Sequence, residues 1–198
     1  SGDEEAQLTF LAARRWLGWS SGRLLVLDIG GGSLEMAVGN DESASSTLSL
    51  PIGAGRMTRE FLTGDPYTGK SIKALTQCSR EQISQSVSGE LLLHQADRIV
   101  ATSKTFRTLA RLTDHWYSDS AKTLEHSALV AAIEKLKDLS NSQRAALPGV
   151  SASRAKQLLA GAIVAEAVMS HLKIDEVEIC PWALREGIVL KWLDWMEK

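Results

Sequence analysis

The chain of 198 residues contains few cysteines, histidines and prolines: two, four and four, respectively. The cysteines, Cys78 and Cys180, lie far apart and show no metal-ligand spacing. We therefore expect free thiols in a reducing compartment, which favours a cytoplasmic protein. The four histidines form no metal-binding pair, so a zinc site is not expected.

The sequence also lacks a long apolar run and a strong excess of either charge. We find neither a membrane span nor a signal peptide. The net charge of −2 argues against binding of nucleic acid by bulk electrostatics, whereas a local basic groove would still suffice for a polyanion. An apolar content of 44% and a charged content of 23% are typical of a globular protein of one domain or two small lobes.

Three short segments near the start predict an antiparallel meander: residues 23–28, 35–39 and 45–50. Helices are expected over residues 4–18, 56–62, 72–94, 124–139, 151–172 and 184–195, with another beginning near residue 104. Two further strands are expected over 98–101 and 176–179. This order predicts an α/β fold in which helices flank a mixed sheet with the meander. It is the order of a ribonuclease H-like lobe, the unit of actin-like ATPase folds.

The most informative segment is Asp28-Ile29-Gly30-Gly31-Gly32-Ser33, which lies between two predicted strands. Glycine permits backbone conformations that turn several N–H groups toward one point, and such a nest holds phosphate oxygens. An aspartate at a strand end can hold the accompanying Mg²⁺ through water. The alternative is a tight β-turn, although a two-residue hairpin turn does not require three glycines.

Two glutamates are candidate partners of Asp28. Glu35 follows it by seven residues on the returning strand, where both carboxylates can face one phosphate; the alternative is a solvent-facing acid. Glu5 falls on the helical row of Ala12 and Trp16, where a carboxylate is costly without a partner. By contrast, Ser1 and Glu4 have a structural role as a predicted capping box.

A second candidate phosphate loop joins the strand at 98–101 to the next helix. Helix N-termini offer free N–H groups and hydroxyls to anions. Lys104, Arg107 and Arg111 follow at helical spacing and suit a basic stripe along a polyanion path. The alternative has Ser103 as an N-cap and the cations on a solvated face. The phosphate-binding candidates in the two loops are Gly30, Gly31, Gly32, Ser33, Thr102, Ser103, Lys104, Thr105 and Arg107.

Five motifs in this order resemble the exopolyphosphatase and guanosine pentaphosphate phosphohydrolase (Ppx/GppA) phosphatase family. They run from the first residue almost to the last and are Ser1-Gly2-Asp3-Glu4-Glu5-Ala6, Asp28-Ile29-Gly30-Gly31-Gly32-Ser33-Leu34-Glu35, Thr102-Ser103-Lys104-Thr105, Leu147-Pro148-Gly149 and Ala183-Leu184-Arg185-Glu186-Gly187. Two departures stand out: Lys104 replaces a usual glycine, and Pro181-Trp182 replaces a common Asp-Gly.

The resemblance implies an actin-like fold and Mg²⁺-dependent hydrolysis of terminal phosphoanhydride bonds in polyphosphate or a guanosine polyphosphate. It implies that Glu5 is the general base and that Asp28 and Glu35 position metal and water. The family's first phosphate loop, of the type Asp-x-Gly-Ser-Asn, has no match here. We therefore expect residues 1–198 to form one α/β lobe, the C-terminal half of a module whose N-terminal lobe is absent. A homodimer is a further expected partnership.

Two other functions remain compatible with the residues. An ATP-dependent kinase or chaperone-type ATPase shares this fold, because fold alone does not determine function. A non-catalytic sensor of guanosine polyphosphates would bind without releasing phosphate. Three acids near a phosphate site favour catalysis, since anion binding alone gains nothing from them.

Overall fold

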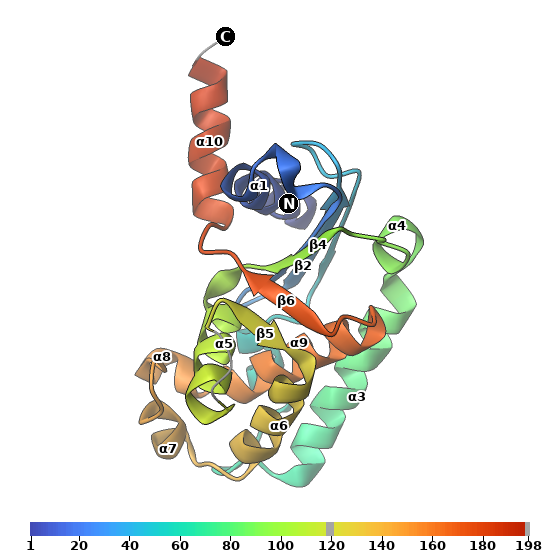
Figure 1. Ribbon diagram of the computed structural model, residues 1–198. Coiled ribbons are helices and arrows are strands. Elements are labelled where there is room, and N and C mark those ends of the chain that lie inside the picture. Colours follow the sequence, from blue (N-terminus) through green and yellow to red (C-terminus); the bar gives the residue numbers. More distant parts are fainter. Residues whose placement is uncertain (118–120, 197–198) are drawn as a thin grey trace.

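One mixed sheet organises the chain in the computed structural model, which describes residues 1–117 and 121–196 (Figure 1). Within these residues the sheet has six strands in the order β3-β2-β1-β4-β6-β5. The parallel centre consists of β1 (Leu24–Ile29), β4 (Arg98–Ala101) and β6 (Glu176–Ile179). The antiparallel meander adds β2 (Leu34–Gly39) and β3 (Ser46–Leu50), and β5 (Thr123–Glu125) pairs antiparallel with β6.

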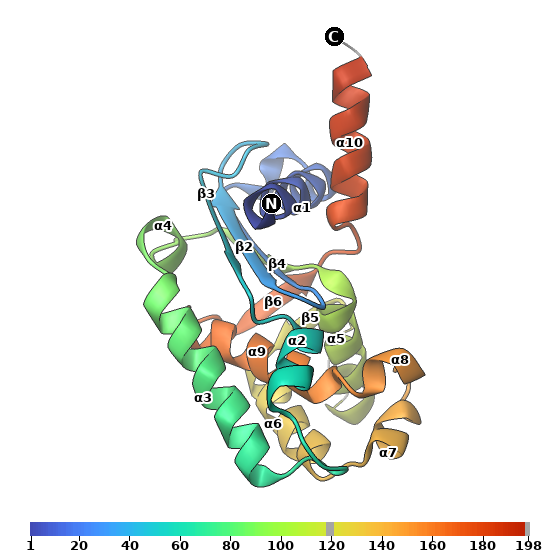
Figure 2. The same ribbon diagram turned by 180° about the vertical axis from the view of Figure 1, so that it is seen from behind.

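Five helices cover one face of this sheet (Figure 2). They are α2 (Ala54–Phe61), α3 (Gly69–Ser86), α5 (Ser103–Tyr117), α6 (His126–Lys137) and α9 (Leu158–His171). Alternation along β1 and β2 directs Leu25, Leu27, Leu34 and Met36 toward these helices, where they join the larger apolar core. Helix α9 is apolar around its whole circumference because α3, α5 and α6 surround it.

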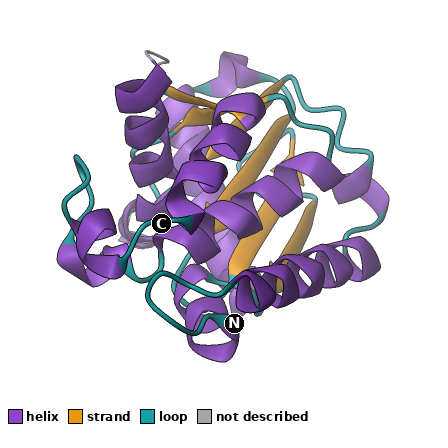
Figure 3. Cartoon of the chain, turned by 90° about the horizontal axis from the view of Figure 1, so that it is seen from below, coloured by secondary structure: helices purple, strands orange, loops and turns teal. Residues whose placement is uncertain are grey.

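The opposite face carries α1 (Gly2–Leu17), so that helices flank the strands on both sides (Figure 3). The alternate residues of the strands, such as Val26 and Ala37, point to this face. They pack with Phe10 of α1 in a second, smaller cluster. Helix α10 (Leu184–Met196) packs along α1 and then projects away from the rest of the chain. The rings of Trp16 and Trp182 contact each other at this junction, with centroids 5.5 Å apart.

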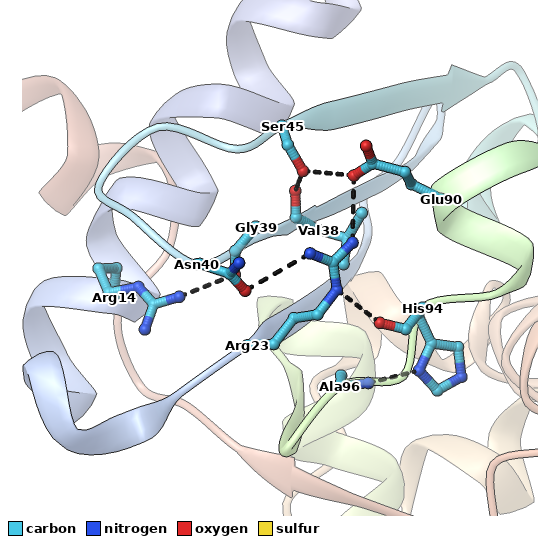
Figure 4. Close-up of polar contacts among 9 residues, drawn as sticks. All are labelled: Arg14, Arg23, Val38, Gly39, Asn40, Ser45, Glu90, His94 and Ala96. Atoms are coloured by element: carbon cyan, nitrogen blue, oxygen red, sulfur yellow. Dashed lines mark hydrogen bonds and ion pairs between the residues drawn. The ribbon is translucent and has the colours of Figure 1, made fainter.

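Arginine side chains hold the end of the sheet where β2 finishes. Arg14 is fully buried and donates to the carbonyl oxygens of Gly22, Gly39 and Asp41 at 2.8–3.1 Å. In the same region Arg23 donates to the carbonyl oxygen of His94 at 2.7 Å and pairs with Glu90 on the short helix α4 (Gly89–Leu92) (Figure 4). These bonds satisfy backbone groups that would otherwise be buried without partners.

The predicted fold class is correct, and several details differ. The helix expected over 72–94 ends at Ser86, because Val87 and Ser88 are extended, and the separate helix α4 starts at Gly89. The helix expected over 151–172 is divided into α8 (Ala152–Ala155) and α9. Residues 123–125 form a strand because β6 offers them an edge, and α7 (Asn141–Ala145) was not expected. No described helix is both long and apolar enough to cross a membrane.

Candidate active site at the strand ends

The two acids of the glycine-rich motif lie side by side on the α1 face of the sheet. Asp28 on β1 is directly opposite Glu35 on β2, and Glu35 is opposite Ser49 on β3. Paired residues point to the same face, so these three side chains form a row across the meander. Ser49 Oγ donates to Glu35 Oε1 at 3.1 Å, and Thr102 Oγ1 donates to Asp28 Oδ2 at 2.5 Å.

Burial makes both carboxylates unusually basic. It raises the pKa of Asp28 to about 6, although the Thr102 hydrogen bond and the charge of Arg107 oppose this shift. Burial also raises the pKa of Glu35, against the hydroxyl contributions of Ser33 and Ser49. Each pKa is raised further by neighbouring negative charge. A cation in this site would therefore be stabilised by both groups.

Glu5 contributes to this electrostatic site from the first turn of α1. Its charge raises the pKa of both Asp28 and Glu35, which places it on the side of the row that faces α1. Glu5 is exposed, so the expectation that it occupies a buried helical row is wrong. The reason is that the first turn of α1 extends past the apolar cluster, in which its earliest member is Ala6. The predicted capping box between Ser1 and Glu4 is present.

The glycine segment forms the turn between β1 and β2. The Gly30 amide donates to the Ser33 carbonyl oxygen at 2.9 Å, so the prediction that this amide binds phosphate is not supported. Gly31 and Gly32 are exposed, and a Cβ at either would meet no atom within 4 Å. Neither glycine has a left-handed φ. Glycine at these two positions therefore leaves open space beside the acids rather than relieving strain or crowding in this lobe.

The loop after β4 forms hydrogen bonds to β1, the strand that carries Asp28. Thr102 is fully buried against Asp28, and Thr105 Oγ1 donates to the Ile29 carbonyl oxygen at 2.8 Å. These hydroxyls therefore position β1 rather than face a ligand, contrary to the prediction. Ser103 has a φ of 72°, the kind of local strain that clusters at functional sites. Lys104 is exposed without such strain, so its replacement of glycine does not distort the loop.

The predicted basic stripe lies next to this loop. Arg107 Nε donates to the Ser103 carbonyl oxygen at 3.2 Å, and its Nη1 donates to that of Pro181 at 3.4 Å. Arg111 Nε donates to the Arg107 carbonyl oxygen at 3.2 Å. Arg154 faces the same positive charge, because burial and the charge of Arg107 both lower its pKa. The cations extend from the Asp28 site along α5. Arg111, the farthest of them along this helix, lies beside Gly149.

Sequence reasoning missed two residues that build the site. Ser49 orients Glu35 from a strand whose sequence carries no motif. Gly53 allows the start of α2 to approach the turn, because a Cβ there would lie 2.2 Å from the Ser33 nitrogen. The amides of Ala54 and Arg56 then donate to the carbonyl oxygens of Gly30 and Gly31. The Gly-x-Gly spacing at 53–55 was the signal that could have indicated this contact.

The donor set bears directly on metal binding. Within residues 1–117 and 121–196, no group of three or more His, Cys, Asp or Glu side chains is placed to hold an ion alone. Glu35 is buried and Asp28 partly buried, the two acids repel each other, and in this part of the chain neither forms an ion pair. Two carboxylates with open space beside them fit Mg²⁺, which usually retains waters and shares phosphate oxygens.

This fold, with two acids beside a glycine turn at the strand ends, defines a lobe of the actin-like ATPase class. Comparison with known proteins then specifies the family. The Ppx/GppA phosphatase family model matches residues 1–196, and the chain belongs to that family.

Relatives support this assignment. The chain is 49% identical over 197 residues to exopolyphosphatase 1 of Mycobacterium tuberculosis and 47% identical to that of Mycobacterium leprae. Both alignments cover 98% of this chain but 57% and 58% of the relatives' lengths. The Ppx/GppA enzyme of Aquifex aeolicus has a similar structure, with a TM-score of 0.81, 26% identity, and coverage of 96% of this chain and 63% of that one. The chain thus spans somewhat over half the length of its curated relatives.

Proposed function

We propose that the complete protein is an exopolyphosphatase that releases phosphate from the ends of inorganic polyphosphate. The observation that carries this proposal is the row of Asp28 and Glu35 beside the open space at Gly31 and Gly32. The names of the mycobacterial relatives support polyphosphate as the substrate. The cations along α5 fit a chain of negative charges better than a single small anion.

In the proposed mechanism, water attacks the terminal phosphorus in line with the bond to the rest of the chain. Glu5 accepts a proton from that water, because it is exposed and its carboxylate acts electrostatically on both Asp28 and Glu35. Asp28 and Glu35 orient the water and the terminal phosphoryl group. The amides of Gly31, Gly32 and Ser33 donate to the phosphoryl oxygens, since in the described chain they donate to no other group.

Mg²⁺ is the cofactor that this site fits, with Asp28 and Glu35 as its protein ligands. When bound, it would neutralise the charge that develops on the phosphoryl oxygens. Thr102 and Ser49 hold the two ligands in place through the hydrogen bonds described above. The part of the protein that the relatives have and this chain lacks would supply the opposite wall of the cleft and further phosphate contacts.

The test compares two neighbouring acids in the complete protein. Glu5→Gln removes the proton acceptor, and we expect kcat for phosphate release from polyphosphate to fall by about 10² to 10⁴. Glu4→Gln is the matched control, because glutamine also serves in a capping box. We expect less than a twofold change for it. Phosphate release is measured with Mg²⁺ present and after its removal.

Substrate choice is measured in the same experiment with guanosine pentaphosphate and ATP as competing substrates. Preference for polyphosphate supports the proposal. Turnover of ATP alone would identify an ATPase of the same fold. Binding of guanosine pentaphosphate without any phosphate release would identify a sensor. Full activity of Glu5→Gln would remove Glu5 from the mechanism.

A further inference from the structure

The helix that carries Glu5 packs along α10, and the two backbones approach very closely at Gly187. A Cβ built at Gly187 would lie 2.0 Å from the Leu8 carbonyl oxygen and 2.6 Å from the Leu8 carbonyl carbon. Both neighbours are backbone atoms, so no side-chain rotation can make room. Any larger residue at position 187 must move one helix relative to the other. Gly187 is buried, and its φ lies outside the left-handed region. Its lack of a side chain therefore serves the crossing and not a turn.

The crossing lies close to the catalytic candidate along the helix. Leu8 follows Glu5 by three residues, which is less than one helical turn. On the other side of Glu5, Gly2 approaches β3 so closely that a Cβ there would lie 2.4 Å from Ser49 Cβ. Ser49 is the residue that donates to Glu35. The first turns of α1 are thus fixed between β3 and α10, with Glu5 between the two contacts.

The start of α10 is itself held in place. Glu186 Oε2 accepts a hydrogen bond from the Ala183 amide at 2.8 Å, which fixes the first turn of the helix. The Gly187 amide donates to the Ala183 carbonyl oxygen at 3.1 Å. Ala183, Glu186 and Gly187 all belong to the Ala-Leu-Arg-Glu-Gly motif. The motif therefore shapes the helix end that touches α1.

We infer that Gly187 is a positioning residue for Glu5. It allows α1 to pack closely against α10 and so determines where the proton acceptor lies. The inference rests on the proposed function. The two acids and the glycine turn are positioned by the sheet, whereas the position of Glu5 depends on how α1 packs. Displacement of about 1 Å at a reacting group is enough to reduce a rate about 100-fold. Loss of this contact should reduce kcat and leave substrate binding intact.

The experiment is a double-mutant cycle in the complete protein. Gly187→Ala should lower kcat for phosphate release at least tenfold, with KM for polyphosphate changed less than twofold. In the Glu5→Ala background the same substitution should change kcat less than twofold, because no proton acceptor remains to be displaced. The matched control is Gly69→Ala at the start of α3, where a Cβ meets no atom within 4 Å. It should retain full activity.

Each outcome separates the inference from the proposed function. An inactive wild-type protein contradicts the proposed function. An active wild type with unchanged Gly187→Ala kinetics contradicts only the inference, as does an equal loss in both backgrounds. If Gly187→Ala does not fold, Glu186→Ala loosens α10 without a clash. It must lower kcat at least threefold in the wild type and leave the Glu5→Ala enzyme unchanged; any other result overturns the inference.

Discussion

The two faces of the sheet differ sharply in how they are covered. Helices α2, α3, α5, α6 and α9 enclose one face in a large apolar core. On the other face, α1 meets the strands through a much smaller cluster around Phe10. The glycine turn and the loop after β4 both contact this core side, since Gly53 connects the turn to α2 and Thr105 connects β1 to α5. The candidate base lies on the thinly covered side.

This difference indicates that the two parts of the site have different mechanical support. Segments with fewer buried contacts open at a lower free energy than the core does. The groups proposed to bind phosphate are therefore held rigidly, while Glu5 is held by one helix and its few contacts. Substitutions on the two faces should consequently produce different kinds of loss.

The largest loss of stability is expected when a buried phenylalanine is replaced by alanine, and its size should differ between the two faces. Phe106→Ala on α5 should lower the free energy of unfolding by about 3–5 kcal/mol, because it leaves a cavity in the large core. Phe10→Ala on α1 should fall at the lower end of this range and act locally, since Phe10 belongs to the smaller apolar cluster. Urea unfolding gives the free energies, and amide hydrogen exchange shows whether α1 opens alone. Equal acceleration of exchange in α1 and α9 by Phe10→Ala would contradict the comparison.

An intermediate effect is expected at Asp28, which lies on the α1 face but is held by Thr102 from the loop after β4. Its folded pKa of about 6 exceeds the ordinary value of 3.8, so the folded state binds more protons between these pH values. Stability should therefore fall as pH rises from about 4 to 6 and stay lower above that range. Asp28→Asn should remove the Asp28 part of this pH dependence, leaving that of Glu35, and raise stability at pH 7.5 by about 1–3 kcal/mol. Denaturant unfolding across pH measures both effects.

The same Asp28→Asn protein should lose most of its phosphatase activity, because a neutral amide is a poor ligand for a cation. Ser33→Ala is a useful comparison, since it leaves the charge of Asp28 in place. Two results for Asp28→Asn would contradict a raised pKa of Asp28 in the folded state. One is a loss of stability at pH 7.5, and the other is an unchanged dependence of stability on pH between pH 4 and 6.

The smallest effect is expected from the ion pairs that link α1 to its surroundings. Arg15 pairs with Glu42 and, at 3.1 Å, with Asp194 of α10. All three side chains are about one-third exposed. Arg15→Ala should lower the free energy of unfolding by at most about 1 kcal/mol, and by less in 1 M salt. Urea unfolding at two salt concentrations measures this. A loss above about 2 kcal/mol would show that ion pairs, rather than apolar packing, hold α1 on its face of the sheet.

Local patterns in the sequence were sufficient for much of this arrangement. The seven-residue spacing of Asp28 and Glu35 around a short turn predicted that they share a site, and the register confirms their pairing. The capping box of Ser1 and Glu4 was predicted in the same way. Such features depend only on neighbours in sequence, so local rules describe them well.

Features that depend on distant segments were missed. Ser49 acquires its role from the pairing of β3 with β2, and β5 forms because β6 offers an edge. Glu5 was expected on an apolar helical row but is exposed, because a helical wheel does not show where the apolar cluster ends. Thr102 and Thr105 looked like ligand-binding hydroxyls, but they bond to β1. In each case the tertiary contact decided the outcome.

The ring contact between Trp16 and Trp182 has an optical consequence. Besides these two, the chain has tryptophans at positions 19, 116, 192 and 195, and of the six only Trp116 lies on the heavily covered side, on α5. The intrinsic fluorescence of the protein therefore reports mainly on α1, the segment after it and α10. A change in emission during substrate binding would signal movement of the helix that bears Glu5, without any attached dye.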